Sequence, residues 1–498
     1  MIGRAGLLAM SLLGALVAGV GEAQQPPPPP EVSQEPTGPE PPEPREPEEA
    51  LVGPTAGAPT VALAEAVSIA LEHNFGLLGA ADSVQAARLR ESATKAQFYP
   101  KLTPRYQHSS DNTAFGLDVF QKLPWSGASL TATGTLSSVP QADSPTARSS
   151  DLRLIVTQPL LRGFGPNATY FDLVNSRRGL EGQERNLELA RQRLAIQVTA
   201  SFYAVVAQRQ LLTVSRQSLK RSESLLRASE ARLKIGLVSK LDVFRAQIQA
   251  SQTSDSLVRS EAALQAALEQ FRFLLGLAPS HPLEPEGVTL EEIPPDQVEP
   301  LEIMVARALE KRVDLKEVRD QVRDGERAAS LAKQSLLPQL DVSLNVAQLG
   351  FGPSYGDALR TGDTRVSVSL STSYSLERSA EKVAAAVADI DVQARQRAVT
   401  QKEMEVETDV RAAVRELDRI RKSVELQRQG VDVAAQQRRL ANLRYQRGLA
   451  SNFDVVDAEG QLVLARSALV GLLASYKVAL VELRRATGVL DVAREFAP

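Results

Sequence analysis

Two carboxylates stand close together toward the C-terminal end of the chain. Asp454 and Asp457 lie three positions apart at the start of a predicted helix, so they project from one face of it. If copies of the chain surround a shared axis, they form two stacked acidic rings, which favour cations and raise each other's pKa. The alternative is that Asp454 and the similarly placed Asp242 only cap helices, but a cap does not explain Asp457.

The pattern G-L-x-S-x-x-D-V occurs twice in the chain. It begins at Gly236 and again at Gly448, and the same offset carries Gly276 onto Gly488, which indicates an internal repeat. Glycine adopts a positive φ at little cost, so each pattern predicts a tight turn, or tip, between two helices. The positions shared by the two tips are Gly236, Leu237, Ser239, Gly448, Leu449 and Ser451.

The composition favours a folded protein without catalytic or nucleic-acid chemistry. The 498 residues are 43% hydrophobic and 23% charged, with a formal net charge of −3. No basic stripe indicates a nucleic-acid partner, and the absence of cysteine excludes disulfides, thiolate metal sites and a lipid-anchored cysteine. The three histidines are isolated and no catalytic or phosphate-binding motif is present. We therefore expect no enzymatic activity, no cofactor and no metal.

The N-terminal region predicts export. Residues 1–23 have a single Arg4, an apolar run and small residues ending at Ala23, which is typical of a signal peptide. An uncleaved anchor is less favoured because the run is short for a membrane span. Residues 24–60 are rich in Pro and Glu and predict a disordered linker, with a docking ligand as the alternative. No other stretch approaches a span, so membrane insertion would need β-structure.

Strand-like alternation occurs once in each half of the chain. Leu340–Ala347 and Arg365–Ser371 alternate apolar with polar residues and predict a β-hairpin at about 339–373. Weaker alternation predicts a β-hairpin at about 102–158 in the first half. An additional hairpin is expected at about 115–134 because the first half carries extra residues there. A soluble sandwich would give the same alternation, so this pattern alone does not identify a membrane protein.

Two very long helices follow the strands. Residues 167–235 and 377–447 contain no proline and little glycine, and at about 1.5 Å per residue each would extend on the order of 100 Å. Apolar residues recur every seven positions in the first of them, which is typical of a coiled coil. The expected order is a first repeat at 61–278, a Pro-rich linker at 279–300, a second repeat at 301–490 and a C-terminal tail at 491–498.

Taken in order, these motifs resemble the TolC family of outer-membrane efflux channels. The resemblance rests on Q-P-L-L-R-G-F-G at Gln158–Gly165, on the paired tips, and on A-L-E-x-R-x-D-L at Ala308–Leu315. In the first of these motifs, Gln158, Pro159 and Gly163 would form the turn from strand to helix. The second half departs from the pattern, because Thr372–Lys382 stands where a similar turn is expected.

The resemblance implies an α+β membrane protein. Each protomer of a homotrimer would give four β-strands to one twelve-stranded outer-membrane barrel, continued by a long α-helical coiled-coil tunnel in the periplasm of a Gram-negative bacterium. Physical reasoning also favours several copies, because two strand pairs leave open edges that lipid does not tolerate. A rotational oligomer would close them.

The resemblance also implies roles for individual residues. Asp454 and Asp457 match the aspartates that line the periplasmic constriction, or gate, and Asp242 and Tyr445 match positions that hold the tips closed as a latch. Ala450 stands where well-known members carry the arginine that completes this latch. The two tips resemble the surface that meets a periplasmic adaptor protein.

The implied function is a passive exit duct of a tripartite efflux or type I secretion system. The duct would span outer-membrane lipid and receive substrate from an inner-membrane RND, ABC or MFS pump through a periplasmic adaptor (membrane fusion) protein. The alternative is a non-conducting coiled-coil spacer between membrane and periplasm. A third possibility, a secreted hydrolase, has no residues to support it. The sequence does not indicate the exported substrate.

Overall fold

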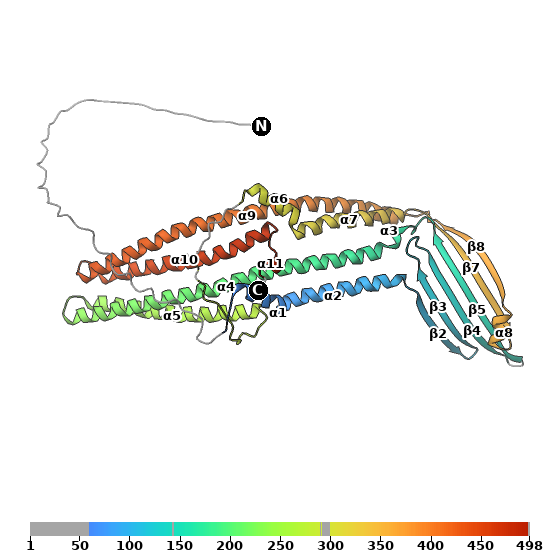
Figure 1. Cartoon of the computed structure of the whole chain (residues 1–498), viewed down its shortest axis with the longest axis horizontal. Coiled ribbons are helices and arrows are strands. Elements are labelled where there is room, and N and C mark those ends of the chain that lie inside the picture. Colours follow the sequence, from blue (N-terminus) through green and yellow to red (C-terminus); the bar gives the residue numbers. More distant parts are fainter. Residues whose placement is uncertain (1–58, 142–143, 289, 291–298, 497–498) are drawn as a thin grey trace, which may run out of the picture. The chain divides into compact units, whose positions relative to one another are not determined.

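The computed structural model describes residues 59–141, 144–288, 290 and 299–496, all of which belong to one structural unit. The predicted signal peptide and nearly all of the Pro/Glu-rich linker lie outside these residues. Figure 1 shows long helices with a β-sheet at one of their ends.

Two helices dominate the described part of the chain. Helix α4 spans Phe171–Lys234 (64 residues) and helix α9 spans Ser379–Gln446 (68 residues), and no proline interrupts either of them. At about 1.5 Å per residue each is roughly 100 Å long. Helix α5 (Lys240–Leu274) returns along α4, and helix α10 (Asn452–Ala486) returns along α9, so each half forms an antiparallel pair (Figure 1).

Shorter helices extend each pair toward the sheet. Helix α2 packs along α4, and helix α7 packs along α9. The bounds of these and the remaining helices are α1 Leu63–His73, α2 Phe75–Lys95, η1 Ala96–Phe98, α3 Pro166–Thr169, α6 Leu301–Lys311, α7 Val313–Gln334, α8 Tyr355–Arg360 and α11 Val492–Glu495.

The main hydrophobic core lies where α1, α4, α5 and α10 meet. Its fully buried aromatic residues are Phe202, Phe271 and Tyr476, and the rings of Phe202 and Phe271 meet edge to face at 6.1 Å between centroids. Helix α10 is apolar and long enough to cross a bilayer by length and composition alone. Because α10 packs against α9 and α4 and buries Leu473 and Tyr476 in this core, we assign its apolar character to helix packing.

A buried ion pair ties the linker between the halves to this core. Strands β1 (Thr60–Val61) and β6 (Glu284–Pro285) pair in parallel, and Arg209 of α4 lies 2.6 Å from the carboxylate of Glu284. Arg209 also donates a hydrogen bond of 2.6 Å to the carbonyl of Pro285. The segment of the linker around Glu284 and Pro285 is therefore fixed on the long helix of the first half.

The sheet is a single antiparallel layer in the order β2-β3-β4-β5-β7-β8. The first half of the chain supplies four of its strands and the second half supplies two. Their bounds are β2 Lys101–Ser109, β3 Asn112–Lys122, β4 Ser129–Gln141, β5 Ser144–Pro159, β7 Gln339–Gly352 and β8 Asp363–Ser373.

The expectation of four strands per chain is therefore wrong, because the described sheet has six. The region at about 102–158 is not one hairpin but four strands, and the additional hairpin at about 115–134 corresponds to β3 and β4. Sequence alternation missed β2 because Pro104 interrupts it and most of its residues are polar. The β2–β3 turn at Ser110–Asp111 contains no glycine or proline, and its only turn signal is a short run of Ser, Asp and Asn.

The two faces of the sheet differ in polarity across all six strands. Directly opposed residues of antiparallel strands point to the same side, so the register assigns each residue to a face. One row crossing the sheet is entirely apolar: Leu102, Val119, Ala132, Leu154, Val346 and Val366. The adjacent row, on the opposite face, is mostly polar or charged: Thr103, Asp118, Thr133, Arg153, Ala347 and Arg365.

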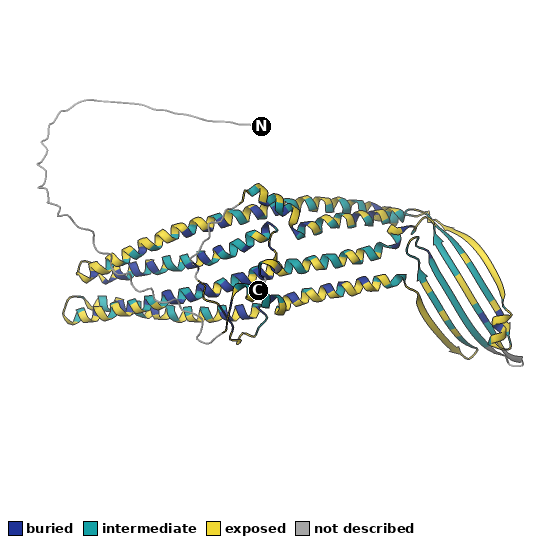
Figure 2. Cartoon of the chain, viewed as in Figure 1, coloured by how far each residue is buried: buried dark blue, intermediate teal, exposed yellow. Residues whose placement is uncertain are grey.

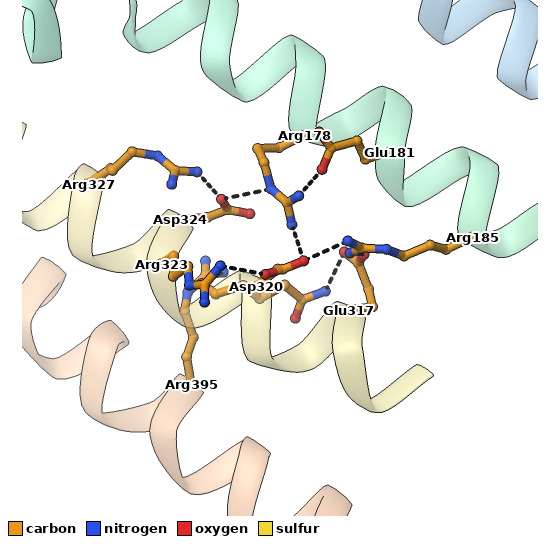
Figure 3. A network of polar contacts seen from close by, with 10 residues as sticks. Arg178, Glu181, Arg185, Glu317, Asp320, Arg323, Asp324, Arg327 and Arg395 are labelled. Carbon is orange, nitrogen blue, oxygen red and sulfur yellow. Dashed lines mark hydrogen bonds and ion pairs between the residues drawn. The ribbon is translucent and has the colours of Figure 1, made fainter. Parts of the chain in front are cut away.

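Ion pairs join the two halves of the chain near the sheet. Arg185 of α4 lies 2.5 Å from the carboxylate of Glu317 and 2.6 Å from that of Asp320, both on α7, and Arg178 lies 2.9 Å from Asp320 (Figure 3). Partial burial raises the pKa of Asp320, but the hydrogen bonds from Arg185 and Arg178 outweigh it and hold this pKa below its ordinary value. We call these four residues the α4–α7 network.

The change Asp320→Asn removes the shared carboxylate of this network. We expect the free energy of unfolding of the helical part to fall by about 1–3 kcal/mol at neutral pH, because a charge-assisted hydrogen bond from Arg185 and an ion pair with Arg178 weaken. Since the folded-state pKa of Asp320 is lowered, its contribution is present above the unfolded pKa of about 4 and is lost as pH falls through the folded value. The loss in free energy of unfolding caused by Asp320→Asn should therefore become smaller at acidic pH.

Denaturation followed by circular dichroism at several pH values checks this. The matched control is Asp418→Asn, which removes an exposed carboxylate on α9 and should leave stability nearly unchanged. Equal stabilities of the two variants at neutral pH would contradict the role given to the α4–α7 network.

Candidate gate at the helical tips

Each antiparallel helix pair ends in the same glycine turn. Gly236 and Gly448 both have a φ of 75°, which an L-residue with a side chain rarely adopts. The N–H of Gly236 donates to the carbonyl of Leu233 at 2.9 Å, and that of Gly448 donates to the carbonyl of Tyr445 at 3.0 Å. These bonds satisfy carbonyls left open at the helix ends and allow the chain to reverse.

A capping box begins the returning helix at each tip. The carboxylate of Asp242 accepts hydrogen bonds from the N–H and hydroxyl of Ser239, at 3.2 and 2.7 Å. The carboxylate of Asp454 accepts the same two bonds from Ser451, at 2.7 and 2.9 Å. The bond from the Ser451 N–H, with that from its hydroxyl, lowers the pKa of Asp454, so this carboxyl stays ionised at neutral pH. Each serine is therefore the N-cap of its helix, and each aspartate completes the capping box from the N3 position within one chain.

Asp457 lies one turn beyond Asp454 on α10 and is exposed, as is Asp454. The capping box therefore does not explain why Asp457 is acidic, in agreement with the expectation from the sequence. The expected mutual rise in pKa requires neighbouring copies, whereas within a single chain the pKa of Asp454 is lowered.

Tyr445 holds the end of α9 against α4. Its side chain is only 4% exposed, and its hydroxyl lies 3.1 Å from that of Ser229. The guanidinium of Arg232 lies over the Tyr445 ring, 4.2 Å from its centroid, and donates to the carbonyls of Tyr445 and Gln446 at 2.8 and 3.2 Å. We call Ser229, Arg232 and Tyr445 the clasp.

The structure does not join the side chains of Asp242 and Tyr445, which the resemblance paired as a latch. Asp242 instead meets the second half through its main chain, because the side-chain amide of Asn452 donates to its carbonyl at 2.8 Å. Both residues nevertheless lie where the first and second halves touch.

A second contact joins the halves farther from the tips. Arg221 of α4 donates to the carboxylate of Glu459 on α10 at 2.8 Å, and the Glu459 side chain is nearly buried. Sequence reasoning missed Arg221, Glu459 and Arg232 because it sought one arginine at position 450. The offset between the two tips aligns Arg232 with Arg444, so both halves carry an arginine at this position. This shared arginine was a sequence signal for Arg232.

The tips also expose large apolar side chains. Leu237 and Leu449, one at each tip, are both 70% exposed, and Phe453 is 60% exposed. Such side chains at an otherwise polar helix end mark a surface that a partner can cover.

The predicted strand-to-helix turn lies at the opposite end of α4. Gln158 donates through its side-chain amide to the carbonyl of Ser126 at 3.0 Å, Pro159 ends β5, and Gly163 has a φ of 82°. At the second junction, where no such motif occurs, Arg378 lies over the ring of Tyr374, 4.5 Å from its centroid. A cation–π contact therefore stands in place of the motif.

The described residues contain no group of three or more His, Asp or Glu side chains that could hold a metal ion.

The family model for outer membrane efflux proteins matches two segments, residues 66–277 and 304–489, which together make up most of the chain. The chain belongs to the outer membrane efflux protein family. This is a family of channel proteins, and membership places the chain in the outer membrane of a Gram-negative bacterium with its helices in the periplasm. No curated protein sequence matches the chain.

Solved outer-membrane channels share the fold of this efflux protein. VceC from Vibrio cholerae is 17% identical with a TM-score of 0.67, covering 86% of this chain and 96% of its own. CmeC from Campylobacter jejuni is 13% identical with a TM-score of 0.66, covering 87% and 88%. MtrE from Neisseria gonorrhoeae, in an open state, is 16% identical with a TM-score of 0.66, covering 86% and 89%. At these low sequence identities, the similarity establishes the fold of this chain alone.

The change Arg232→Ala removes the cation–π contact and the two hydrogen bonds of the clasp. We expect the end of α9 at 438–450 to open more readily, with a loss of about 1–2 kcal/mol in local stability. Hydrogen exchange followed by mass spectrometry should show faster exchange there and unchanged exchange near the sheet. The matched control is Arg227→Ala, which removes a more exposed arginine of α4 that pairs only along its own helix. Equal exchange in both variants would exclude the clasp as a local lock.

Proposed function

We propose that three copies of this efflux protein form a passive exit duct of a tripartite efflux or type I secretion system. The sheets would line a pore across the outer membrane, and the helices would continue it as a tunnel in the periplasm. An inner-membrane RND, ABC or MFS pump would supply both the substrate and the energy, and a periplasmic adaptor would connect pump and duct.

The observation that carries this proposal is the pair of open sheet edges. Within the described residues, β2 pairs only with β3 and β8 pairs only with β7. Every residue of both edge strands is exposed in the single chain (Figure 2). Unpaired backbone groups are not tolerated in lipid, so β2 of one copy would pair with β8 of the next. These two strands run antiparallel to one another, which suits that pairing.

The long helices also present apolar stripes that need partners. On α9, Val383, Val387 and Ile390 are exposed at the spacing of one helix face. On α5, Leu241, Phe244 and Ile248 form a comparable exposed stripe. Contacts between neighbouring copies would bury both stripes and arrange the helices as staves around an axis. We also take the two segments matched by the family model to be two copies of one repeat.

The polar face of the sheet favours a duct over a non-conducting spacer. One row on this face contains Thr133, Arg153 and Arg365, which point away from the apolar face of the sheet. A barrel with its apolar face toward lipid directs these groups inward, where they would line water. A spacer without a lumen would have no use for them.

The tips would form the closable end of the tunnel. Three copies place Asp454 and Asp457 in two acidic rings, and the capping bonds from Ser451 keep the first ring ionised. The clasp holds α9 against α4 of the same chain, so it would resist outward movement of the second helix pair. The exposed Leu237, Leu449 and Phe453 would meet the adaptor.

Single-channel recording of the purified protein in planar bilayers tests the proposal. We expect discrete conductance steps with a preference for cations, because the gate carries ionised carboxylates. The absence of any conductance from correctly assembled protein would favour the spacer.

The double change Asp454→Asn with Asp457→Asn should reduce the cation preference while leaving the tip folded. Asparagine removes the charge but its side-chain oxygen still accepts a hydrogen bond from Ser451, so the cap is largely preserved. The control is Asp255→Asn, an exposed acid on α5 that pairs with Arg259 of the same helix. Identical ion selectivity in the double variant and the unchanged protein would remove the gate assignment.

A further inference from the structure

We propose that the barrel wall contains eighteen strands, six from each of three copies, because β3 and β4 belong to the wall. This inference rests on the proposed function, since it assumes that three copies close a barrel. The expectation of four strands per copy would have given a wall of twelve strands.

The strand order is the first argument. Strand β2 is linked to β5 only through β3 and β4, and the β2–β3 and β3–β4 ladders run without a register shift. If the β3–β4 hairpin lay outside the wall, β2 would lose its hydrogen-bonding partner inside lipid. Because β2 is also the edge that would join the next copy, the hairpin cannot leave the wall without breaking the closure.

The side chains of the hairpin are the second argument. On β3, Leu117 and Val119 lie on the apolar face of the sheet and Asp118 between them lies on the polar face. Asp118 is paired there with Arg105 of β2 at 2.7 Å, so the charge is neutralised beside the lumen. On β4, Ala132 and Thr133 are divided between the faces in the same way. Both strands thus carry the alternation that a membrane-spanning wall requires.

The helix-side turn of the hairpin is the third argument. The carbonyl of Ser126 accepts hydrogen bonds from the Gln158 side chain at 3.0 Å and from the N–H of Gly165 at 3.5 Å. A Cβ on Gly127 would lie 2.7 Å from the carbonyl oxygen of Gly163 and 2.9 Å from the hydroxyl of Thr169, so only glycine fits. The turn is therefore built into the strand-to-helix junction of the chain rather than added to its surface.

Trp125, at the tip of this turn, is the fourth argument. It is 77% exposed and is the single tryptophan of the protein. Tyr99, just before β2, and Tyr374, just after β8, are also exposed at the same end of the sheet. Exposed aromatic rings at one end of a barrel wall form the girdle that rests at the lipid headgroups.

Six strands per copy make the pore wide. Barrel diameter grows roughly in proportion to strand number, so eighteen strands give a diameter about 1.5 times that of twelve, and barrels of this size leave an aqueous channel. Only four of the six strands connect directly to helices, because β3 and β4 are joined by their own turn on the helix side. The pore in the membrane would then be wider than the helical tunnel. Selection of substrates by size would therefore take place at the tips.

Trp125 gives a direct test in the unmodified protein, since no other tryptophan contributes to the emission. The protein would be reconstituted into vesicles of phosphatidylcholine brominated either near the headgroup or near the end of the acyl chain. We expect a large loss of Trp125 emission with the shallow bromines and a smaller loss with the deep ones. Emission unaffected by either lipid would overturn the inference, because the turn would then lie away from the membrane.

A cysteine-free chain also allows single spin labels at Ala132→Cys and Thr133→Cys on β4. The first label should be accessible to oxygen in the lipid and the second to a water-soluble nickel complex. The matched controls are Leu344→Cys and Ser343→Cys on β7, a strand that belongs to the wall whether it has twelve or eighteen strands. Leu344 lies on the apolar face of β7 and Ser343 on its polar face. If both β4 labels responded to the nickel complex alone while the β7 pair alternated, the hairpin would not be part of the wall.

Electron cryomicroscopy of the protein in lipid nanodiscs counts the strands. Eighteen strands around a three-fold axis would support the inference. A trimer with a twelve-stranded wall and a separate hairpin would overturn this inference alone and leave the proposed duct intact. A single copy without a closed barrel would overturn the proposed function as well.

Discussion

The structure depends on one constraint, which is that backbone N–H and C=O groups at a sheet edge need partners when water is absent. A six-stranded sheet from one chain has two such edges, β2 and β8, and both are fully exposed in the single chain. In the proposed duct, further copies would pair with these edges, and the closed wall would place the apolar row against lipid and the polar row around water. Two helix pairs extend from the sheet, and the proline-free α4 and α9 reach on the order of 100 Å from it.

The contacts between the two helix pairs are unequal along their length. Near the sheet, the α4–α7 network joins two arginines to two carboxylates that are mostly shielded from solvent. Near the tips, the clasp consists of one arginine stacked on Tyr445 and a few hydrogen bonds, with Arg221 and Glu459 behind it. A long rod that is held firmly at one end and lightly at the other opens most readily at the lightly held end. In the proposed duct, this arrangement would combine a rigid pore with a movable gate.

The sequence predicted the features that rest on local rules. The absence of proline, the scarcity of glycine and the seven-residue apolar recurrence predict the long helices. A glycine followed by Ser-x-x-Asp predicts each tip and its capping box. The strand number could not be predicted in this way, because β2 contains Pro104 and polar residues whose partners are identified only by the register with β3. Tyr445 was predicted as a latch residue, but its partner Arg232 was missed for a similar reason, since the two lie far apart in sequence and meet only when the halves pack together. Contacts of this kind are set by tertiary structure.

Amide hydrogen exchange of β2 and β8 in the assembled, lipid-embedded protein tests the central claim most directly. If copies of the chain close the sheet, the outward N–H groups of these two strands are paired, and both should exchange as slowly as β4 and β5 inside the sheet. If β2 and β8 instead exchange much faster than β4 and β5, their edges are open. A closed wall, and with it the duct, would then be contradicted.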